Sequence, residues 1–333
     1  MVAPLRAMRS KATPVISPTV SVIVCTYTER RWETLVSAVA SLRAQHRPPH
    51  QCVVVVDHNE LLLRRARAAF PPDVEVVSNE DVRGLAGARN TGVGLATGEV
   101  VAFLDDDADA DPGWLAAMVG HYRDRQVAGV GGVAEATWPR GQRPGWFPRE
   151  FDWVVGCTYR GLPEVVAPVR NPIGASMSIR RSLIDELGGF DTAIGRVGTT
   201  PLGCEETEFA VRARQHFAGI EFLHVPDAVV HHLVTPERTR VRYFVRRCYA
   251  EGLSKAAVAR RTGADAALSS ERRYVAVTLP RAVVAELKNA LRGDPMGVAR
   301  AAMIAVGLCA TTIGYVTARA STPRSNSSKG RHV

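Results

Sequence analysis

Three consecutive carboxylates, Asp105, Asp106 and Asp107, directly follow the apolar run at residues 100–104. In an open α/β sheet, ligands bind outside the carboxyl ends of the strands, so this position suits a substrate. Three adjacent negative charges repel one another unless a cation neutralises them, and hard oxygen ligands of this kind suit Mg²⁺ or Mn²⁺ carrying a diphosphate. The simpler alternative is a solvated acidic turn with helix-capping residues.

A glycine-rich segment at residues 83–92 lies just upstream of these carboxylates. Such an entry into a helix lets the backbone approach a ligand closely, and Arg89 can pair with phosphate oxygens through two hydrogen bonds. Arg83 and Arg89 are therefore candidate ligand-binding residues; the alternative is a helix start followed by a surface arginine. The later glycines are spaced G-x-G-x-x-x-G and precede a strand instead of following one, which excludes the dinucleotide-binding fingerprint.

The elements that must position these groups follow a regular alternation from residue 19 to about 104, which is typical of βαβ units on a mostly parallel sheet. The predicted strands are 20–25, 52–56, 74–77 and 100–104, and the predicted helices are 32–44, 60–70 and 85–96. Asn59 and Gly84 are placed to begin the second and third helices. Asp111 and Pro112 have the pattern of an N-cap followed by a proline at the first helical position, opening a helix at 114–125.

The alternation stops at about Gly129. Residues 138–153 are rich in proline and aromatic residues. We interpret them as a loop nearer to a substrate surface than to a core, which lines an acceptor groove or else covers the core. Further on, the pattern predicts strands at 175–179, 220–223 and 228–230, a helix at 182–187 that ends at Gly188 and Gly189, and a helix at 205–216.

Beyond Pro236 the pattern is helical, with a basic helix at 239–261 and a second helix at 273–292 that is interrupted near Pro280. Residues 301–318 are 18 positions without a charged residue, and this length is at the lower limit for crossing a bilayer. Their alanine, glycine and threonine content makes them only weakly hydrophobic. A spanning helix, an interfacial or re-entrant helix, and a buried helix of a soluble protein all remain open.

The composition, with 46% hydrophobic and 23% charged residues, indicates a soluble globular body. The formal net charge is +9, and residues 238–261 hold eight basic residues against one acid, Glu251. Nucleic-acid binding needs a basic face with stacking aromatics across the fold, whereas this is a single stretch. We expect no nucleic-acid partner and instead a membrane surface or an anionic ligand. Six cysteines without a CxxC pair and the lack of an apolar signal-peptide run before Pro14 indicate the cytoplasm.

An ordered set of motifs covers roughly residues 19–260 and resembles the inverting family-2 glycosyltransferases of the GT-A fold. The motifs are VSVIVCTYTER (20–30), GLAGARNTGVGLATGEVVAFLDDDADADPGWL (84–115), GGFD (188–191), CEETEF (204–209) and PDAVVHHLV (226–234). The resemblance implies an α/β fold in which a mixed, mainly parallel nucleotide-binding sheet is flanked by helices, here with a C-terminal helical extension.

The resemblance also implies which residues bind the nucleotide. Tyr27 stands where the family stacks a side chain on the nucleobase, and Glu29 in the same motif is a further donor-binding candidate. Asp57 ends the second strand, where an acidic pair recognises the nucleoside. Here the pair is Asp57-His58, where many relatives have two aspartates, so UDP is the favoured carrier and the usual uracil contact is in question.

For the metal, the resemblance places Asp105 and Asp107 as the first and last members of the DxD motif. Asp107 is the expected ligand of the metal, and Asp106 is expected near the ribose or the sugar. His232 matches a late histidine that approaches the metal or the diphosphate, whereas its neighbour His231 is expected to be structural. Apart from the family, either histidine would more often be a core or surface group than a ligand.

The catalytic base is expected from Glu205-Glu206, where many relatives have Glu-Asp. Inverting transfer needs one carboxylate to take the proton of the acceptor hydroxyl as it attacks the anomeric carbon, and we assign this role to Glu206. The alternative is an acidic first turn that complements the helix dipole.

The prediction is a metal-dependent inverting glycosyltransferase, using Mn²⁺ or Mg²⁺, that transfers one sugar from a nucleotide diphosphate sugar to a hydroxyl acceptor. The chain has no tryptophan after Trp153 and so lacks the QxxRW motif of processive synthases, which favours single addition. The C-terminal features suggest a lipid-linked or cell-envelope glycan as acceptor and a location peripheral to or anchored at the cytoplasmic face of the cell membrane. The alternatives are a sugar nucleotidyltransferase and a non-catalytic subunit that binds sugar nucleotide or glycan.

The predicted organisation has four parts: a disordered basic leader (1–17), a catalytic domain (18–235), a helical, membrane-associated region (236–320) and a disordered tail (321–333).

Overall fold

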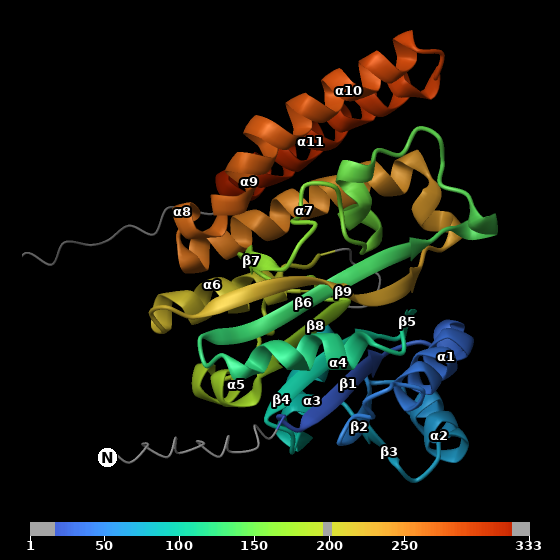
Figure 1. Ribbon diagram of the computed structural model, residues 1–333, viewed down its shortest axis with the longest axis vertical. Helices are drawn as coiled ribbons and strands as arrows, with labels where there is room; N and C mark the ends of the chain where they lie inside the picture. Colours follow the sequence, from blue (N-terminus) through green and yellow to red (C-terminus); the bar gives the residue numbers. More distant parts are fainter. Residues whose placement is uncertain (1–16, 196–201, 322–333) are drawn as a thin grey trace, which may run out of the picture.

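The computed structural model describes residues 17–195 and 202–321, so the predicted leader and tail lie almost wholly outside the described residues. A nine-stranded mixed sheet forms the centre, with the order β3-β2-β1-β4-β8-β6-β9-β5 and β7 paired to β9 (Figure 1). The strands are β1 (Val20–Thr26), β2 (Gln51–Val56), β3 (Val74–Ser78), β4 (Val100–Asp105), β5 (Ala108–Ala110), β6 (Val127–Thr137), β7 (Ala167–Val169), β8 (Ser176–Arg180) and β9 (Glu221–Leu233).

Helices cover both faces of this sheet. They are α1 (Trp32–Arg43), α2 (Glu60–Ala69), α3 (Leu85–Leu95), α4 (Trp114–Val119), α5 (Arg181–Leu187) and α6 (Glu205–His216). Alternate residues of β1 point to opposite faces: Val22 and Val24 join the cluster that contains α1, α2 and α4, whereas Ile23 joins the cluster of α3, α5 and α6. The mixed sheet flanked by helices is confirmed.

In the N-terminal half, strands β1 to β4 are parallel, and the predicted strands and helices agree with the structure within two residues. The Asn59 side chain caps α2 by accepting from the Leu62 amide at 3.1 Å, and Gly84 precedes α3 at φ 131°, a conformation that favours glycine. The prediction for Asp111 is wrong. Gly113 is the N-cap of α4, and the Asp111 carboxylate bonds His231 instead. The helix predicted at 114–125 is α4 followed directly by a 3₁₀ helix, η2 (Gly120–Arg123).

The second half differs more from the prediction. Strand β6 is missing from it, and the two short strands at 220–223 and 228–230 are one long strand, β9. Strand β6 escapes prediction because of its glycines. A Cβ at Gly132 would lie 2.1 Å from the Ala228 carbonyl oxygen, so the close approach of β6 and β9 requires glycine. Glycines do not contribute to the alternating hydrophobic pattern by which a strand is predicted.

The aromatic stretch at 138–153 packs on a core, as the second of its two interpretations predicts, and the expectation that it resembles a substrate surface more than a core is wrong. Phe147 and Phe151 are fully buried, and both rings lie 5.3 Å from that of Phe244. These contacts join the 3₁₀ helix η4 (Arg149–Val155) to the C-terminal helices, because aromatic rings are the large apolar surfaces available there. The region after residue 236 therefore shares a core with residues 138–155.

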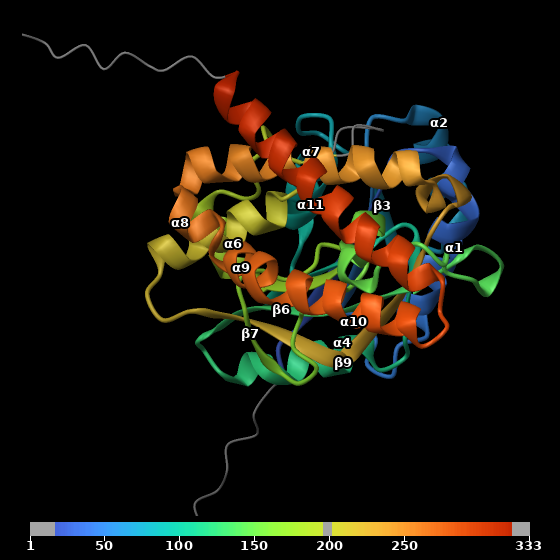
Figure 2. The same ribbon diagram turned by 90° about the horizontal axis from the view of Figure 1, so that it is seen from above.

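The C-terminal region is helical, as predicted. It contains η5 (Pro236–Thr239), α7 (Val241–Thr262), α8 (Ala264–Ala267), α9 (Ser269–Arg273), the π-helical turn η6 (Tyr274–Thr278), α10 (Leu279–Leu291) and α11 (Met296–Ala320). The π-helical turn stands at the predicted interruption before Pro280. Helices α10 and α11 lie at the end of the molecule far from β1–β3, and α11 crosses α7 (Figures 1 and 2). Helix α11 is long and apolar enough to cross a membrane by length and composition alone.

Candidate active site

The parallel strands β1, β2 and β4 end at one edge of the sheet, and the candidate residues gather there. The register pairs Cys25 with Asp105 and Thr26 with Val56, so the residues that follow these strands lie side by side. A pocket opens at this edge. Its lining comes from β1 and the loop after it, the ends of β2 and β4, and the start of α3: Cys25, Thr26, Tyr27, Arg31, Asp57, Leu85, Ala88, Asp105 and Asp106.

Asp105, Asp107 and His232 form a cluster at this edge. Potential ligand atoms of all three lie within 4.8 Å of one another. The pairing of β5 with β9 aligns Ala108 with His232 and so brings the histidine to the end of β4. His232 Nε2 lies 3.3 Å from Asp107 Oδ1 and 3.9 Å from Asp105 Oδ2. His231, on the opposite face of β9, is largely exposed and bonds Asp111 at 2.8 Å.

The donor set of this cluster fits a divalent cation. Two carboxylates and one imidazole are ligands that Mn²⁺ accepts, and the carboxylates alone also suit Mg²⁺. Within the described residues, the buried atoms Asp106 Oδ2 and His232 Nδ1 have no hydrogen-bond partner. Buried polar atoms normally have partners, so this edge retains unused capacity for polar ligands. Asp105, Asp107 and His232 are the residues that would hold the metal.

Two arginines that the sequence did not single out also contact the carboxylates. Arg31 bonds Asp106 Oδ1 at 2.5 Å and Asp107 Oδ2 at 3.0 Å, and Arg238 lies 3.4 Å from Asp107 Oδ2. Arg31 ends a short 3₁₀ helix that follows β1. Its position in the sequence, between Tyr27 and the first helix, was the signal that could have marked it as a residue of the site. Arg238 belongs to the basic stretch that is predicted as a whole to face a membrane surface or an anionic ligand, so its place at the carboxylates is a difference from the prediction.

The electrostatics of the cluster follow from these contacts. Burial would raise the pKa of Asp107, but His232, Arg31 and Arg238 outweigh it and hold the pKa of that carboxyl well below its usual range. Burial raises the pKa of Asp106 to about 6 although Arg31 opposes the shift. Burial lowers the pKa of His232, but the Asp107 carboxylate dominates and raises it to about 10. Asp107 is thus an anion at neutral pH.

The two glutamates at the start of α6 have different surroundings. Glu205 is buried, and its Oε1 accepts from Arg89 Nη1 at 2.9 Å. Arg89 is itself 2% exposed, donates to the Gly174 carbonyl at 3.2 Å and lies 4.0 Å from Asp105. Glu206 is half-buried near Gly174, whose Cβ would lie 3.9 Å from Glu206 Cδ. Arg89 therefore links the acidic cluster to the turn that presents Glu206.

Burial, followed by the charge of Glu205, raises the pKa of Glu206 to about 7, and the Arg89 charge only partly opposes this. A carboxylate with a pKa near neutrality can take up a proton and release it again at the working pH.

Of the other predicted donor-binding residues, Asp57 and Tyr27 line the pocket, and Glu29 and Arg83 do not. The Asp57 carboxylate is buried and accepts from Asn79 Nδ2 at 2.7 Å and from the Gly84 amide at 3.1 Å, so it holds the turn before α3 as well as lining the pocket. Tyr27 lines the pocket, 5.6 Å from the Arg31 guanidinium. Glu29 and Arg83 are exposed and do not line it.

Comparison with known proteins identifies the family. The profile described as glycosyl transferase family 2 matches residues 21–188. The glucosyl-dolichyl phosphate glucuronosyltransferase of Haloferax volcanii is 37% identical over 239 residues, which cover 71% of this chain and 76% of that protein. The pre-mycofactocin glycosyltransferase of Mycobacterium tuberculosis is 30% identical over 176 residues, 53% of this chain and 35% of that protein.

Solved structures agree on the fold. The mannosyltransferase PcManGT from Pyrobaculum calidifontis, in complex with GDP-Man and Mn²⁺, superposes with a TM-score of 0.58 at 21% identity, covering 91% of this chain and 88% of that one. GalNAc-T7 with UDP, GalNAc and Mn²⁺ has a TM-score of 0.51 at 20% identity, covering 72% and 48%. The chain therefore belongs to glycosyl transferase family 2, with the GT-A fold, and is a glycosyltransferase.

Proposed function

We propose that the protein is a metal-dependent, inverting glycosyltransferase that moves one sugar from a nucleotide diphosphate sugar, UDP-linked in the first instance, to a hydroxyl acceptor. The observation that carries this proposal is the position of Arg89, which contacts Glu205 beside the proposed base and lies near Asp105 in the acidic cluster. The residues that would bind the leaving group and the residue that would remove the proton thus lie on two sides of the buried Arg89 side chain.

For the donor, we propose that Tyr27 stacks on the nucleobase and that Asp57 recognises the nucleoside, since both line the pocket at the strand edge. Asp106 would bind the ribose or the sugar. Glu29 and Arg83, which are exposed and do not line the pocket, would contact the donor only from outside it. The buried position of Arg89 favours a positioning role over direct contact with phosphate.

For the metal, Asp107 and His232 would be ligands together with Asp105, and Mn²⁺ or Mg²⁺ bound there would neutralise the charge of the diphosphate leaving group. The two oxygens of Asp107 have different partners: Oδ1 faces His232 and Oδ2 faces the two arginines. The arginines therefore keep Asp107 ionised and oriented while Oδ1 remains directed toward the ligand cluster.

For proton removal, Glu206 would act as the base. Its carboxylate accepts the proton of the acceptor hydroxyl while that oxygen attacks the anomeric carbon from the side opposite the diphosphate. The Arg89–Glu205 ion pair holds the first turn of α6, and a well-placed carboxylate is worth orders of magnitude in rate.

The acceptor that we propose is a lipid-linked or cell-envelope glycan. The similarity to an enzyme named for glucosyl-dolichyl phosphate supports a lipid carrier. The apolar helix α11 supports membrane association, and the location that we propose is peripheral to or anchored at the cytoplasmic face of the cell membrane. We also propose the division into a catalytic domain at 18–235 and a membrane-associated helical region at 236–320.

The test is nucleotide release from UDP-, GDP- and dTDP-sugars with Mn²⁺, with Mg²⁺ or with a chelator, in the wild type, Asp107→Ala and Glu206→Gln. We expect turnover of one donor that requires metal and is lost in both variants, with an inverted anomeric configuration in the product. Retention of configuration, or turnover that is unaffected by chelator, would refute the mechanism. Binding of a donor without turnover, when lipid acceptors are supplied, would point to a non-catalytic subunit.

A further inference from the structure

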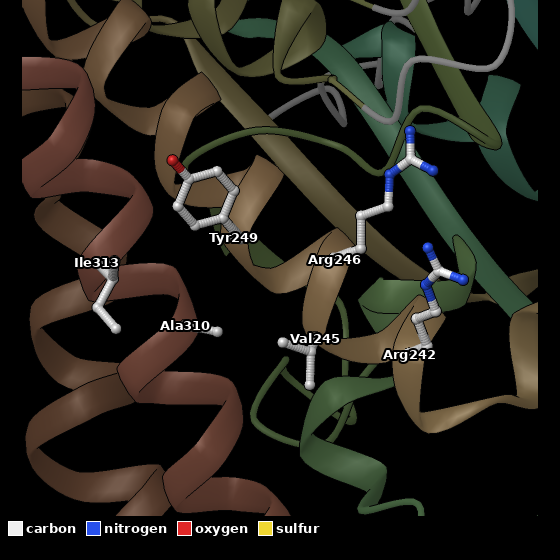
Figure 3. Close-up of a pocket in the computed structure, with 6 residues that line it drawn as sticks. All are labelled: Arg242, Val245, Arg246, Tyr249, Ala310 and Ile313. Carbon is white, nitrogen blue, oxygen red and sulfur yellow. The ribbon is translucent and has the colours of Figure 1, made fainter. Parts of the chain in front are cut away.

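A groove of about 450 Å³ lies between α7 and α11, apart from the nucleotide pocket. Its lining is almost wholly apolar and comes from Val245 and the Tyr249 ring on α7, from Ala310 and Ile313 on α11, and from the alkyl stems of Arg242 and Arg246 (Figure 3). The two guanidinium groups point in the same direction and away from α11 (Figure 3). The volume is within the usual range for ligand sites.

Arg242 and Arg246 are exposed, and among residues 17–195 and 202–321 neither has an ion-pair partner. Their neighbours on the same segment differ: Arg247 bonds Glu251 at 2.8 Å, and Arg238 lies near Asp107. One turn of helix, about 6 Å, separates Arg242 from Arg246, so both can contact a single phosphate group. The groove is therefore an apolar wall with two available cations beside it, on the side away from α11.

The outward side of α11 is mainly apolar up to Val316, with Thr312 as an exposed polar residue within it and the exposed Thr317 and Arg319 following. The exposed apolar residues at helical spacing, which we call the outer stripe, are Ala302, Ala305, Val306, Cys309, Ile313 and Val316. Surface helices of soluble proteins normally carry polar residues on this side. Ile313 is 58% exposed and belongs both to the stripe and to the groove, so the two surfaces are continuous.

The inner side of α11 contacts protein throughout. A Cβ at Gly307 would lie 2.4 Å from the Phe151 ring, and a Cβ at Gly314 would lie 2.1 Å from the Tyr249 carbonyl oxygen. A spanning α11 would carry α7 and its arginines into the hydrocarbon, at a cost of several kcal/mol per charge. A helix with one apolar side and a basic neighbour instead suits the bilayer interface.

We propose that this groove binds a phosphate-linked membrane lipid, with the hydrocarbon chain against Val245, Tyr249 and Ile313 and the phosphate at Arg242 and Arg246, while the outer stripe enters the same leaflet. This inference rests on the proposed function, because it names the part of the chain that holds the lipid of the acceptor. The segment that carries the groove begins near the active site: Arg238 contacts Asp107, and Arg242 follows four residues later.

The test is flotation of the full chain with three kinds of vesicle: phosphatidylcholine alone, phosphatidylcholine with phosphatidylglycerol, and phosphatidylcholine with a polyprenyl phosphate. We expect binding to both anionic vesicles and a 10- to 30-fold weaker affinity, about 1 kcal/mol for each arginine, in Arg242→Ala/Arg246→Ala. The matched control is Arg123→Ala/Arg125→Ala, two exposed arginines before β6, which we expect to bind like the wild type.

A second pair of variants tests the apolar part. Ile313→Asp is expected to weaken binding to all vesicles that the wild type binds, whereas Leu61→Asp, at a 67% exposed position on α2, is not. The inference is overturned if the arginine variant binds like its control, if the wild type binds neither kind of anionic vesicle, or if the wild type is a dimer in solution that Ile313→Asp dissociates. That last result would assign the stripe to a second copy.

Nucleotide release into water, measured on the same variants without vesicles, separates the two proposals. We expect it to be unchanged, and with a membrane-bound acceptor we expect a higher KM at similar kcat in Arg242→Ala/Arg246→Ala. Vesicle binding as described without any donor turnover would refute only the proposed function. Donor turnover without vesicle binding would refute only this inference.

Discussion

Arg89 and Glu205 form a buried ion pair, with Nη1 2.9 Å from Oε1, between helices whose residues are 116 positions apart in the chain. Their side chains are 2% and 5% exposed. Burial disfavours the charged form of Arg89, but Glu205 and then Asp105 outweigh it, and the pKa of Arg89 is raised. A pair this deeply buried costs more to break than it contributes when formed, because the remaining charge is left without a partner.

Removing one partner should therefore destabilise the protein strongly. We expect Arg89→Met to lower the free energy of unfolding by about 3–5 kcal/mol, measured by denaturant titration. The double variant Arg89→Met/Glu205→Gln should lose much less than the sum of the two single losses, since no unpaired charge remains. Additive losses would mean that the two side chains do not interact.

Asp107→Ala should lower donor turnover by about 100- to 1,000-fold, because this carboxylate is the buried anion of the proposed metal cluster. The comparison is Asp109→Ala, a nearby carboxylate on β5 outside the cluster, for which we expect turnover near that of the wild type. Titration of Mn²⁺ in both variants gives the second readout. Equal metal dependence in the two would remove Asp107 from the ligand set.

Glu206 should control the pH dependence of the rate. Its pKa of about 7 means that the fraction of carboxylate, and with it kcat, falls as the pH drops below about 7. Glu206→Gln should remove this limb together with about 100- to 10,000-fold of the rate, whereas Glu206→Asp should keep the limb at a reduced rate. A rate profile of Glu206→Gln that still titrates near neutrality would assign the limb to another group.

The same shift predicts the effect of pH on stability. The pKa of Glu206 rises from an ordinary 4.5 to about 7 on folding, so between these values the folded state binds more protons than the unfolded state. Wild-type stability should then fall as the pH rises through this window, and Glu206→Gln should lack that part of the slope. Thermal unfolding at a series of pH values measures the difference.

Arg31→Ala should destabilise the protein by about 2–4 kcal/mol, because Asp106 then keeps a buried charge without a partner. Arg31→Lys should recover part of the loss, since one ammonium cannot bridge two carboxylates as a guanidinium does. Arg30→Ala, at the exposed neighbouring position, is the control and should stay within about 0.5 kcal/mol. Thermal unfolding with and without Mn²⁺ checks whether added metal reduces the loss.

Gly252→Ala should loosen the contact between α7 and α11. The new Cβ would lie 2.0 Å from the Thr311 carbonyl oxygen, so the helices must separate, at a cost of about 1–3 kcal/mol. Gly94→Ala on α3 meets nothing within 4 Å and should gain up to about 1 kcal/mol from helix propensity. Unfolding curves of both variants measure the two effects, and an unchanged curve for Gly252→Ala would mean that α7 and α11 can separate without loss of stability.

The parallel half of the sheet was predictable because its strands are continuous apolar runs, as in residues 100–104, and its helices carry local start signals such as Asn59. Strand β6 was not predictable, since Gly129 and Gly132 in it serve contacts with distant residues that leave no local pattern. The aromatic residues Phe147 and Phe151 gave no sign of what they would pack against. Their partner, Phe244, lies on a helix nearly a hundred residues away.

For the site, the sequence by itself determined the chemical groups: the three carboxylates after β4, the glutamate pair at the start of α6, and the motif order that indicated the family. Residue type and local order are enough for this, because strand ends and helix starts are local features. Only the tertiary structure decided the partners. Arg31 and Arg238 converge on Asp107, and Arg89 bonds Glu205 below the pocket, through distances that depend on how the sheet and the helices pack. A long arginine side chain has many reachable partners, and packing selects one.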